Sequence, residues 1–313
     1  MQHPDASIII PTRNRAAWLP TCLAHLEQQT FPAARFEVIV ADAGSSDDTF
    51  SVLERYAQGS PIRIRPLRLE TQGFGPARNE AVKWAAGQLL LFLADDELAS
   101  PRLLEHHWEA QSGLDRERCL YGEVHAHPQL PPETLTRLFL TDSPPEDEYT
   151  ELVSFLDAQA SNLSISRTLF ERSGGFDQQD DLHPLEHIAW AFRLFKAGVE
   201  TRRISDTRSY VWQPATLDDE RARLYDLGYG LYNVLRMTHS SAIVERYHLN
   251  KGPIEQALSA FLVPFYLRAC QRQHRENPVF TGTLQRRILQ HDRACGFNDA
   301  RQDRPRRHPK SDS

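Results

Sequence analysis

The stretch Gln88-Leu-Leu-Leu-Phe-Leu-Ala-Asp-Asp-Glu97 joins an unbroken apolar run to adjacent acidic residues. Such a run, without polar alternation, is typical of a strand buried on both faces of a parallel sheet. Two more apolar runs, 7–11 and 36–41, are rich in β-branched residues and also predict buried strands. Helical periodicity separates the runs, over residues 16–29, about 49–56 and 76–86. This alternation predicts a doubly wound α/β sheet.

Each of these predicted strands ends in a polar cluster. The clusters are Pro11-Thr-Arg-Asn14, Asp42-Ala-Gly-Ser45 and Asp95-Asp96. Ligands of such sheets bind beyond the carboxyl ends of the strands, so we expect all three clusters to line one crevice. Adjacent carboxylates repel each other, and Mg²⁺ or Mn²⁺ would relieve that repulsion. A solvated Asp-Asp turn is the alternative. Asp42 could accept a hydrogen bond from a base or ribose, or could simply stabilise a turn.

The composition excludes several classes of protein. The chain has 313 residues, of which 40% are hydrophobic and 25% are charged, enough for a substantial core. Its net charge of −6 includes no basic surplus, which disfavours nucleic acid as a partner. Four scattered cysteines without a Cys-x-x-Cys pair indicate a reduced cytosolic chain without a zinc ribbon. Without a signal-peptide pattern or a run of ~18 apolar residues, we expect a cytoplasmic protein.

The remaining sequence changes character near residue 216. Up to about residue 212 it mixes predicted strands (119–124 and 162–166), a proline-rich loop (144–148) and a helix (184–198). After Thr216 the periodicity is helical, over residues 217–237, 253–273 and 281–293. The basic, polar end of the chain predicts disorder.

Several motifs follow one another in a recognisable order: Ser7-Ile-Ile-Ile-Pro-Thr-Arg-Asn-Arg15, Phe36-Glu-Val-Ile-Val-Ala-Asp-Ala-Gly-Ser-Ser-Asp-Asp-Thr49, Gly75-Pro-Ala-Arg-Asn-Glu-Ala81, Phe92-Leu-Ala-Asp-Asp-Glu97, Asn162-Leu-Ser-Ile-Ser-Arg167, Phe170, Gly174-Gly-Phe-Asp177 and Glu186 to Arg193. Together they resemble family 2 glycosyltransferases of the GT-A fold, over roughly residues 5–212. The resemblance implies a Rossmann-like mixed, mostly parallel sheet flanked by helices. We therefore expect a GT-A domain over 1–215, a helical C-terminal extension over 216–300 and a disordered tail over 301–313.

The resemblance also implies a function. The chain would move a sugar from a nucleoside-diphosphate sugar to a hydroxyl acceptor, depending on Mn²⁺ or Mg²⁺ and with inversion. Asp96 would bind the metal, and Asp95 would lie nearer the ribose or the sugar. The residues that would bind the nucleotide sugar are Pro11, Thr12, Asn14, Asp42, Arg78, Asn79 and Asp95.

One departure from the family concerns the general base. The family usually carries Glu-Asp before the helix that ends in Arg, and the Asp is the base of inverting members. Counting back from Arg193 places His187 at that position, after an intact Glu186. A histidine can act as a base near neutral pH, and Glu186 could also take the role. The alternative is that His187 only packs, or binds the diphosphate, and that activity is altered or lost.

Other interpretations compete with this one. A sugar-nucleotide-binding protein of the same fold that lost its base is the runner-up, followed by a sugar-phosphate nucleotidyltransferase, although the glycine-rich loop of that class is missing. His183-Pro-Leu-Glu-His187 spells a zinc-peptidase motif, but Pro184 places His183 at the helix boundary. His106 and His107 are expected on a helix surface.

The acceptor stays open among polysaccharides and other glycans, lipid-linked compounds and small molecules, as does oligomerisation. The apolar segment 261–267, followed by Arg268 and Arg272, could contact the inner face of the membrane peripherally. Packing against the protein is the favoured alternative.

Overall fold

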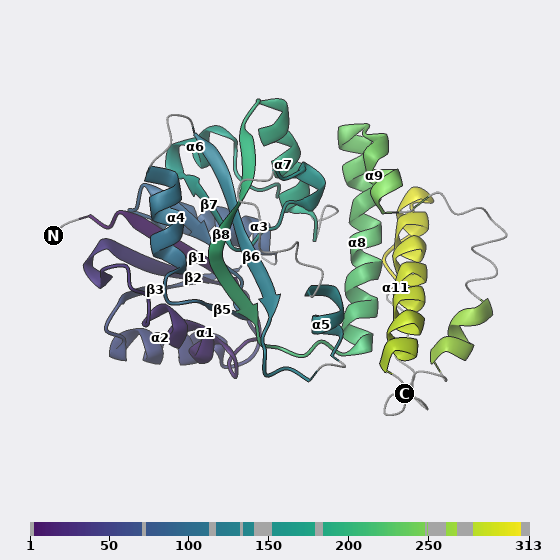
Figure 1. Ribbon diagram of the computed structural model, residues 1–313, viewed down its shortest axis with the longest axis horizontal. Coiled ribbons are helices and arrows are strands. Elements are labelled where there is room, and N and C mark those ends of the chain that lie inside the picture. Colours follow the sequence, from purple (N-terminus) through teal and green to yellow (C-terminus); the bar gives the residue numbers. More distant parts are fainter. Residues whose placement is uncertain are drawn as a thin grey trace. The chain divides into compact units, whose positions relative to one another are not determined.

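The computed structural model describes residues 3–70, 73–112, 117–131, 134–140, 152–178, 184–247, 249, 261–267 and 278–307. The chain divides into two compact units, which we describe separately (Figure 1). The first comprises Met1–Pro128, Ser143–Gln178 and Trp190–Gln213, and the second comprises Gln129–Asp142, Gln179–Ala189 and Pro214–Ser313.

The first unit is built on a mixed sheet that has eight strands in the described residues. Its order is β3-β2-β1-β4-β7-β6-β8-β5. The strands are β1 (Ala6–Thr12), β2 (Phe36–Ala43), β3 (Arg63–Leu69), β4 (Leu89–Phe92), β5 (Glu97–Ala99), β6 (Arg118–Ala126), β7 (Leu163–Ser166) and β8 (Glu200–Val211). Strands β3, β2, β1 and β4 run parallel, whereas β7 pairs antiparallel with both β4 and β6. The α/β architecture and the mixed sheet expected from the sequence are confirmed.

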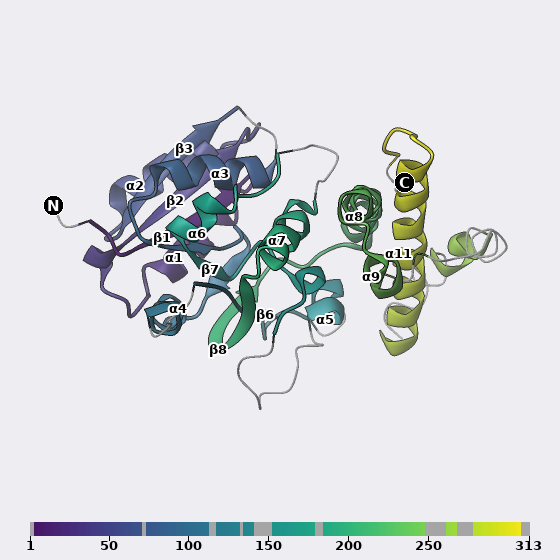
Figure 2. The ribbon, with the colours of Figure 1, turned by 90° about the horizontal axis from the view of Figure 1, so that it is seen from above.

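Helices cover both faces of this sheet. Because strand side chains alternate, Ile8 and Ile10 point to one face and Ile9 to the other. The first face packs against α1 (Leu19–Leu26), α2 (Thr49–Gly59) and α4 (Leu103–Ser112), and the second against α3 (Phe74–Trp84), α6 (Arg167–Arg172) and α7 (Glu186–Lys196). Figure 2 shows α3 and α4 on opposite sides of the strands. Because helices cover both faces of the sheet, a ligand can reach the sheet at the ends of its strands.

One helix residue differs from expectation. His106 is partly exposed on α4, but His107 is fully buried. Its ring nitrogens lie 2.8 Å from Ser164 Oγ and 2.9 Å from Asn162 Oδ1. The expectation that His107 lies on a helix surface is wrong, because β7 supplies hydroxyl and amide partners that allow the ring to be buried. Burial lowers the pKa of His107 to about 4.

The second unit is helical where the structure describes it. It contains α5 (Leu135–Leu140), α8 (Leu217–Thr238), α9 (Ser241–Arg246) and α11 (Pro278–Arg301). The helices α8 and α11 pack closely: Tyr225 Oη donates to Asp299 at 2.6 Å, and Arg221 Nε donates to Asp292 at 2.9 Å. A capping box at Thr216 and Asp219 starts α8. These helices match the predicted 217–237 and 281–293.

Some predictions fall on residues outside the description. Residues 261–267 of the predicted helix 253–273 are helical, and the segments on either side of them lie outside the described residues. The proline-rich loop 144–148, His183 and residues 308–313 of the predicted tail also lie outside them. In the described residues, we find no helix that is both long and apolar enough to span a membrane.

Candidate active site

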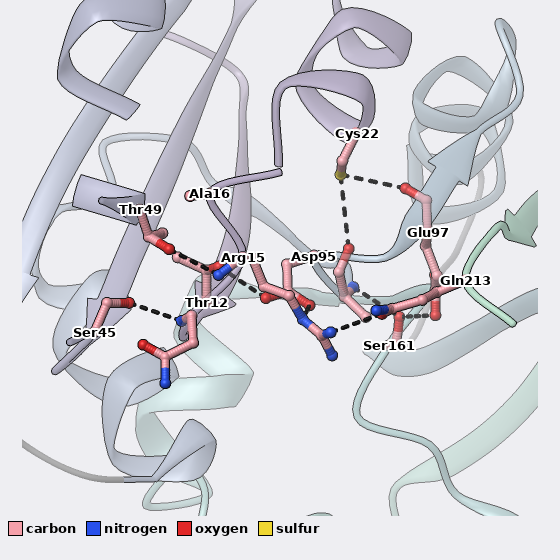
Figure 3. Close-up of polar contacts among 12 residues, drawn as sticks. Thr12, Arg15, Ala16, Cys22, Ser45, Thr49, Asp95, Glu97, Ser161 and Gln213 are labelled. Atoms are coloured by element: carbon pink, nitrogen blue, oxygen red, sulfur yellow. Dashed lines mark hydrogen bonds and ion pairs between the residues drawn. The ribbon is translucent and has the colours of Figure 1, made fainter. Parts of the chain in front are cut away.

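The carboxyl ends of β1, β2 and β4 meet at one edge of the first unit. Thr12, the last residue of β1, lies opposite Asp42 of β2 in the parallel register. Thr12 Oγ1 also donates a 2.7 Å hydrogen bond to Asp95 Oδ2 in the loop after β4 (Figure 3). Pro11 precedes Thr12 and is buried in β1 opposite Ala41. The structure thus brings the three predicted strand-end clusters together, as parallel topology requires.

Arg15 joins this site, although the sequence analysis gave it no role. Its Nε lies 3.5 Å from Asp95 Oδ1, and its Nη1 donates to Gln213 Oε1 at 2.6 Å. The backbone N–H of Arg15 donates to Thr49 Oγ1 at 2.7 Å, which holds the loop against the start of α2. Figure 3 shows Arg15 between Asp95 and Gln213. A sequence pattern could not reveal the contact between Arg15 and Gln213, because the two residues are 198 positions apart in the chain.

The charge of Asp95 is only partly compensated. Burial and the neighbouring charge of Asp96 raise the pKa of Asp95 to about 6, against the lowering effects of Arg15 and the Thr12 hydroxyl. Burial also raises the pKa of Asp96, and Arg15 opposes that shift. Two neighbouring carboxyl groups that both resist ionisation are a natural place for a cation.

Asp42 is fully buried, and among the described residues only one of its two carboxylate oxygens accepts hydrogen bonds. Its Oδ1 accepts hydrogen bonds from the backbone N–H of Ser45, at 3.0 Å, and from the Ser45 hydroxyl. Its Oδ2 has no hydrogen-bond partner among the described residues. A buried carboxylate oxygen without a donor is costly, so a ligand N–H or hydroxyl at this position would be stabilised.

Asn14 connects the β1 loop to the β2 loop. Its φ is 54°, a left-handed conformation that asparagine tolerates better than most residues. Its backbone N–H donates to Ser45 Oγ at 2.9 Å, and its Oδ1 accepts from the Ser46 N–H at 2.8 Å. Asn14 therefore holds the two loops that flank Asp42 in one arrangement.

Two predicted residues come from α3. Arg78 is buried, with its guanidinium 5.5 Å from the ring centroid of Phe176. Asn79 Nδ2 donates to Phe176 O at 2.8 Å, and Asn79 Oδ1 accepts from Phe176 N at 2.9 Å. Through these two hydrogen bonds, Asn79 holds the turn around Gly175 against α3. The turn is also held by Arg193, which bonds to Gly175 O and forms an ion pair with Asp177.

Comparison with known proteins shows a resemblance to one family over part of the chain. Residues 7–135 match "Glycosyl transferase family 2". Validoxylamine A glucosyltransferase from Streptomyces hygroscopicus subsp. jinggangensis is 31% identical over 224 residues, which cover 63% of this chain and 52% of that protein. A PGL/p-HBAD biosynthesis glycosyltransferase from Mycobacterium tuberculosis is 42% identical over 125 residues, covering 40% of this chain and 48% of that protein. Residues 7–135 are thus similar to glycosyl transferase family 2.

Solved structures of other proteins have a similar fold. A mannosyltransferase from Pyrobaculum calidifontis, in complex with GDP-Man and Mn²⁺, has a TM-score of 0.62 at 16% identity, over 97% of this chain and 89% of that one. Staphylococcus aureus TarS 1–349 in complex with UDP has a TM-score of 0.54 at 17% identity, over 98% and 94% of the two chains. These likenesses establish the GT-A fold. The match to the two curated relatives spans about half of their length.

Glu97, to which the sequence analysis gave no role, contacts the acidic loop that follows β4. Glu97 is buried; it accepts a hydrogen bond from Ser209 Oγ at 2.9 Å and another from Ser161 Oγ. Ser161 Oγ in turn accepts a hydrogen bond from the Ala94 N–H at 3.0 Å. Ser161 thus links the Glu97 carboxylate to the backbone of the acidic loop. Burial raises the pKa of Glu97 to about 7. Cys22 Sγ lies 3.3 Å from Glu97 O on the other side (Figure 3).

The predicted metal site has few protein ligands. No group of three or more His, Cys, Asp or Glu side chains suited to a metal occurs in the described residues. Asp95 and Asp96 offer hard carboxylate oxygens, which fits Mg²⁺ or Mn²⁺ with its other ligands taken from water and phosphate. The observation that favours a cation is that burial, together with the charge of Asp96, raises the pKa of Asp95.

The predicted bases lie in the second unit of the chain. Glu186 begins α7 and is buried, and His187 follows it, partly exposed. Asp95 and Asp96 belong to the first unit. The role of Glu186 and His187 as bases stays a prediction.

Proposed function

We propose that this protein is a family 2 glycosyltransferase that transfers a sugar from a nucleoside-diphosphate sugar to a hydroxyl acceptor. The observation that carries the proposal is the meeting of Thr12, Asp42 and Asp95 at the ends of parallel strands, with Asp42 Oδ2 lacking a donor. The names of the relatives and the nucleotide-bound neighbours support a nucleotide-sugar donor.

The nucleotide would occupy the crevice between the β1 and β2 loops. Asp42 Oδ2 would accept a hydrogen bond from the base or ribose, because it is buried and lacks a donor. Asn14 would keep this pocket in shape through its bonds to Ser45 and Ser46. The other residues proposed to border the nucleotide sugar are Pro11, Thr12, Arg78, Asn79 and Asp95.

Asp96 would hold Mn²⁺ or Mg²⁺, with Asp95 oriented by Thr12 and Arg15 nearer the ribose or the sugar. When bound, the ion would stabilise the departing diphosphate as a Lewis acid. His187 or Glu186 would take the proton of the acceptor hydroxyl as that oxygen attacks the anomeric carbon. Attack opposite the departing diphosphate would invert the configuration.

Calorimetry with nucleoside diphosphates, with and without Mn²⁺, tests the proposal. Asp42→Asn should weaken nucleotide binding by about tenfold or more with or without metal, since it removes a charged acceptor. Asp96→Asn should abolish the dependence of nucleotide affinity on Mn²⁺ and stop sugar transfer. Asp48→Asn is the matched control, because Asp48 is exposed in the same turn and its side chain does not cap α2.

The outcomes separate the alternatives. If no nucleoside diphosphate binds, the proposed function is wrong. Nucleotide binding without turnover across a broad acceptor panel would indicate a sugar-nucleotide-binding protein that has lost its base. Synthesis of a nucleotide sugar from a nucleoside triphosphate and a sugar phosphate would indicate a nucleotidyltransferase.

A further inference from the structure

Strands β6 and β8 are parallel neighbours, and their paired residues place charged and aromatic side chains along one face of the sheet. In their parallel register Glu123 lies opposite Arg208 and His125 lies opposite Tyr210. The pairing continues past the strand ends, where the His127 N–H donates to Val211 O at 2.9 Å. Because strand side chains alternate, His125, His127, Tyr210 and Trp212 share one face. We call these four residues the aromatic strip.

The rings of the aromatic strip contact one another. The His127 and Trp212 rings are 4.3 Å apart between centroids, at an interplanar angle of 74°. Tyr210 lies 6.0 Å from both His125 and His127. All four side chains are half-buried, whereas the large aromatic residues of the core, such as Phe92 and Trp190, are fully buried. The strip therefore retains accessible ring surface.

The strip ends at the acidic loop. The Trp212 N–H donates to Asp96 O at 3.3 Å, so Trp212 directly neighbours the proposed metal ligand. Gln213, the next residue, accepts the hydrogen bond from Arg15, which pairs with Asp95. Trp212 also lines one small cavity together with Asp95, Asp96 and Trp18. A molecule resting on the strip would thus reach the place where the donor sugar is proposed to lie.

The chemistry of the strip suits a sugar ring. Aromatic side chains offer large apolar faces with polar tips, and the C–H face of a pyranose can pack on such a surface. Burial, together with the charge of His25, lowers the pKa of His127, which favours the uncharged form of its ring. The ion pair of Glu123 and Arg208, 3.3 Å between oxygen and nitrogen, borders the strip with groups that can bond to hydroxyls.

We propose that the aromatic strip is an acceptor subsite that binds a pyranose ring, so that the acceptor is a carbohydrate or carries one. This inference rests on the proposed function, because a site for an acceptor sugar has meaning only beside a donor site. It assigns to Trp212 a specificity-determining role, with His127 and Tyr210 extending the surface on which the sugar rests.

Saturation-transfer NMR on the full chain tests the subsite with methyl glycosides of glucose, galactose, mannose and N-acetylglucosamine and with their disaccharides. Bound sugars should show their strongest signals from the C–H protons of one ring face. Trp212→Ala should weaken sugar binding at least about fivefold, as expected for the loss of an aromatic contact. Trp212→Phe should retain most of the binding. Trp84→Ala is the matched control, because Trp84 is 53% exposed at the end of α3.

Nucleotide calorimetry on the same variants distinguishes the two proposals. Trp212→Ala keeps the backbone N–H that bonds to Asp96 O, so its UDP or GDP affinity should stay within about twofold of wild type. Sugar binding that is lost in Trp212→Ala and retained in Trp212→Phe would support the subsite, whether or not a nucleotide binds. Absence of nucleotide binding would count against the proposed function alone. Absence of sugar binding in the wild type, or equal sugar binding in Trp212→Ala, would overturn the subsite.

Discussion

Thr12 Oγ1 donates a 2.7 Å hydrogen bond to Asp95 Oδ2 across 83 positions of sequence. The bond links the end of β1 to the loop after β4, because these strands are parallel neighbours in the sheet. It satisfies one oxygen of a buried carboxylate whose pKa is already raised to about 6 by burial and by Asp96. The position of Asp95 therefore depends on a residue at the end of the neighbouring strand.

Replacing Thr12 tests this dependence. Thr12→Val keeps the shape of the side chain but removes the donor, and the free energy of unfolding should fall by about 1–3 kcal/mol at neutral pH. The pKa of Asp95 should rise further, because the hydroxyl now lowers it. Thr12→Ser should restore both properties. Urea unfolding and a carboxyl NMR titration measure them, and equal values in Thr12→Val and wild type would contradict the prediction.

The pH dependence of transfer tests the predicted base. If His187 removes the acceptor proton, the rate should rise with pH as the imidazole loses its own proton, because only the neutral ring can act as a base. His187→Ala should lose most turnover and keep donor affinity, because the lost interaction belongs to the transition state. His187→Asp should retain activity and move the acidic limb to lower pH.

Glu186→Gln is the control for this experiment. A large loss of rate in Glu186→Gln with a mild effect in His187→Ala would assign the base to the glutamate. Normal turnover in both variants would exclude this pair of residues as the base.

Glu97 makes stability depend on pH. Burial raises its pKa from 4.5 to about 7 in the folded protein, so the folded state holds the proton more tightly than the unfolded state does. Its contribution to stability is present at low pH and is lost, at up to about 1.4 kcal/mol per pH unit, as pH rises from 4.5 through 7. Glu97→Gln should lack this loss, because Ser161 and Ser209 can rotate their hydroxyls to bond to an amide.

Thermal unfolding at pH 5 and pH 8 measures the effect. The melting temperature of Glu97→Gln relative to wild type should be higher at pH 8 than at pH 5. Glu54→Gln, an exposed position on α2, is the control and should show no such change. A constant difference between Glu97→Gln and wild type at the two pH values would contradict the assignment.

Gly228 brings α8 and α11 into close contact. A Cβ at this position would lie 1.9 Å from Arg293 O, which is backbone and cannot move away cheaply. Gly228→Ala should therefore lower the free energy of unfolding of the helical unit by about 1–3 kcal/mol or more. Gly59→Ala has open space around its Cβ and should leave stability nearly unchanged. Denaturant unfolding monitored by circular dichroism compares them, and equal stability would refute the close packing.

Local patterns predicted much of the fold and part of the candidate site. The apolar runs that became β1, β2 and β4 were visible because a strand buried on both faces is apolar at consecutive positions. Thr12, Asp42 and Asp95 could be named because each lies at the end of such a run, and parallel strands bring those ends together. These inferences need only neighbours along the chain.

The sequence by itself indicated the buried strands and their alternation with helices in the first hundred residues, the adjacent acids Asp95 and Asp96, and motifs that resemble a known family. Only the tertiary structure decided that Arg15 bonds to Gln213, 198 positions away, that Glu97 braces the acidic loop, and that His107 is buried. It also placed Trp212 beside Asp96. The physical reason is that partners so distant in sequence are chosen by how β7 and β8 pair within the sheet, and strand pairing leaves no local period in the sequence.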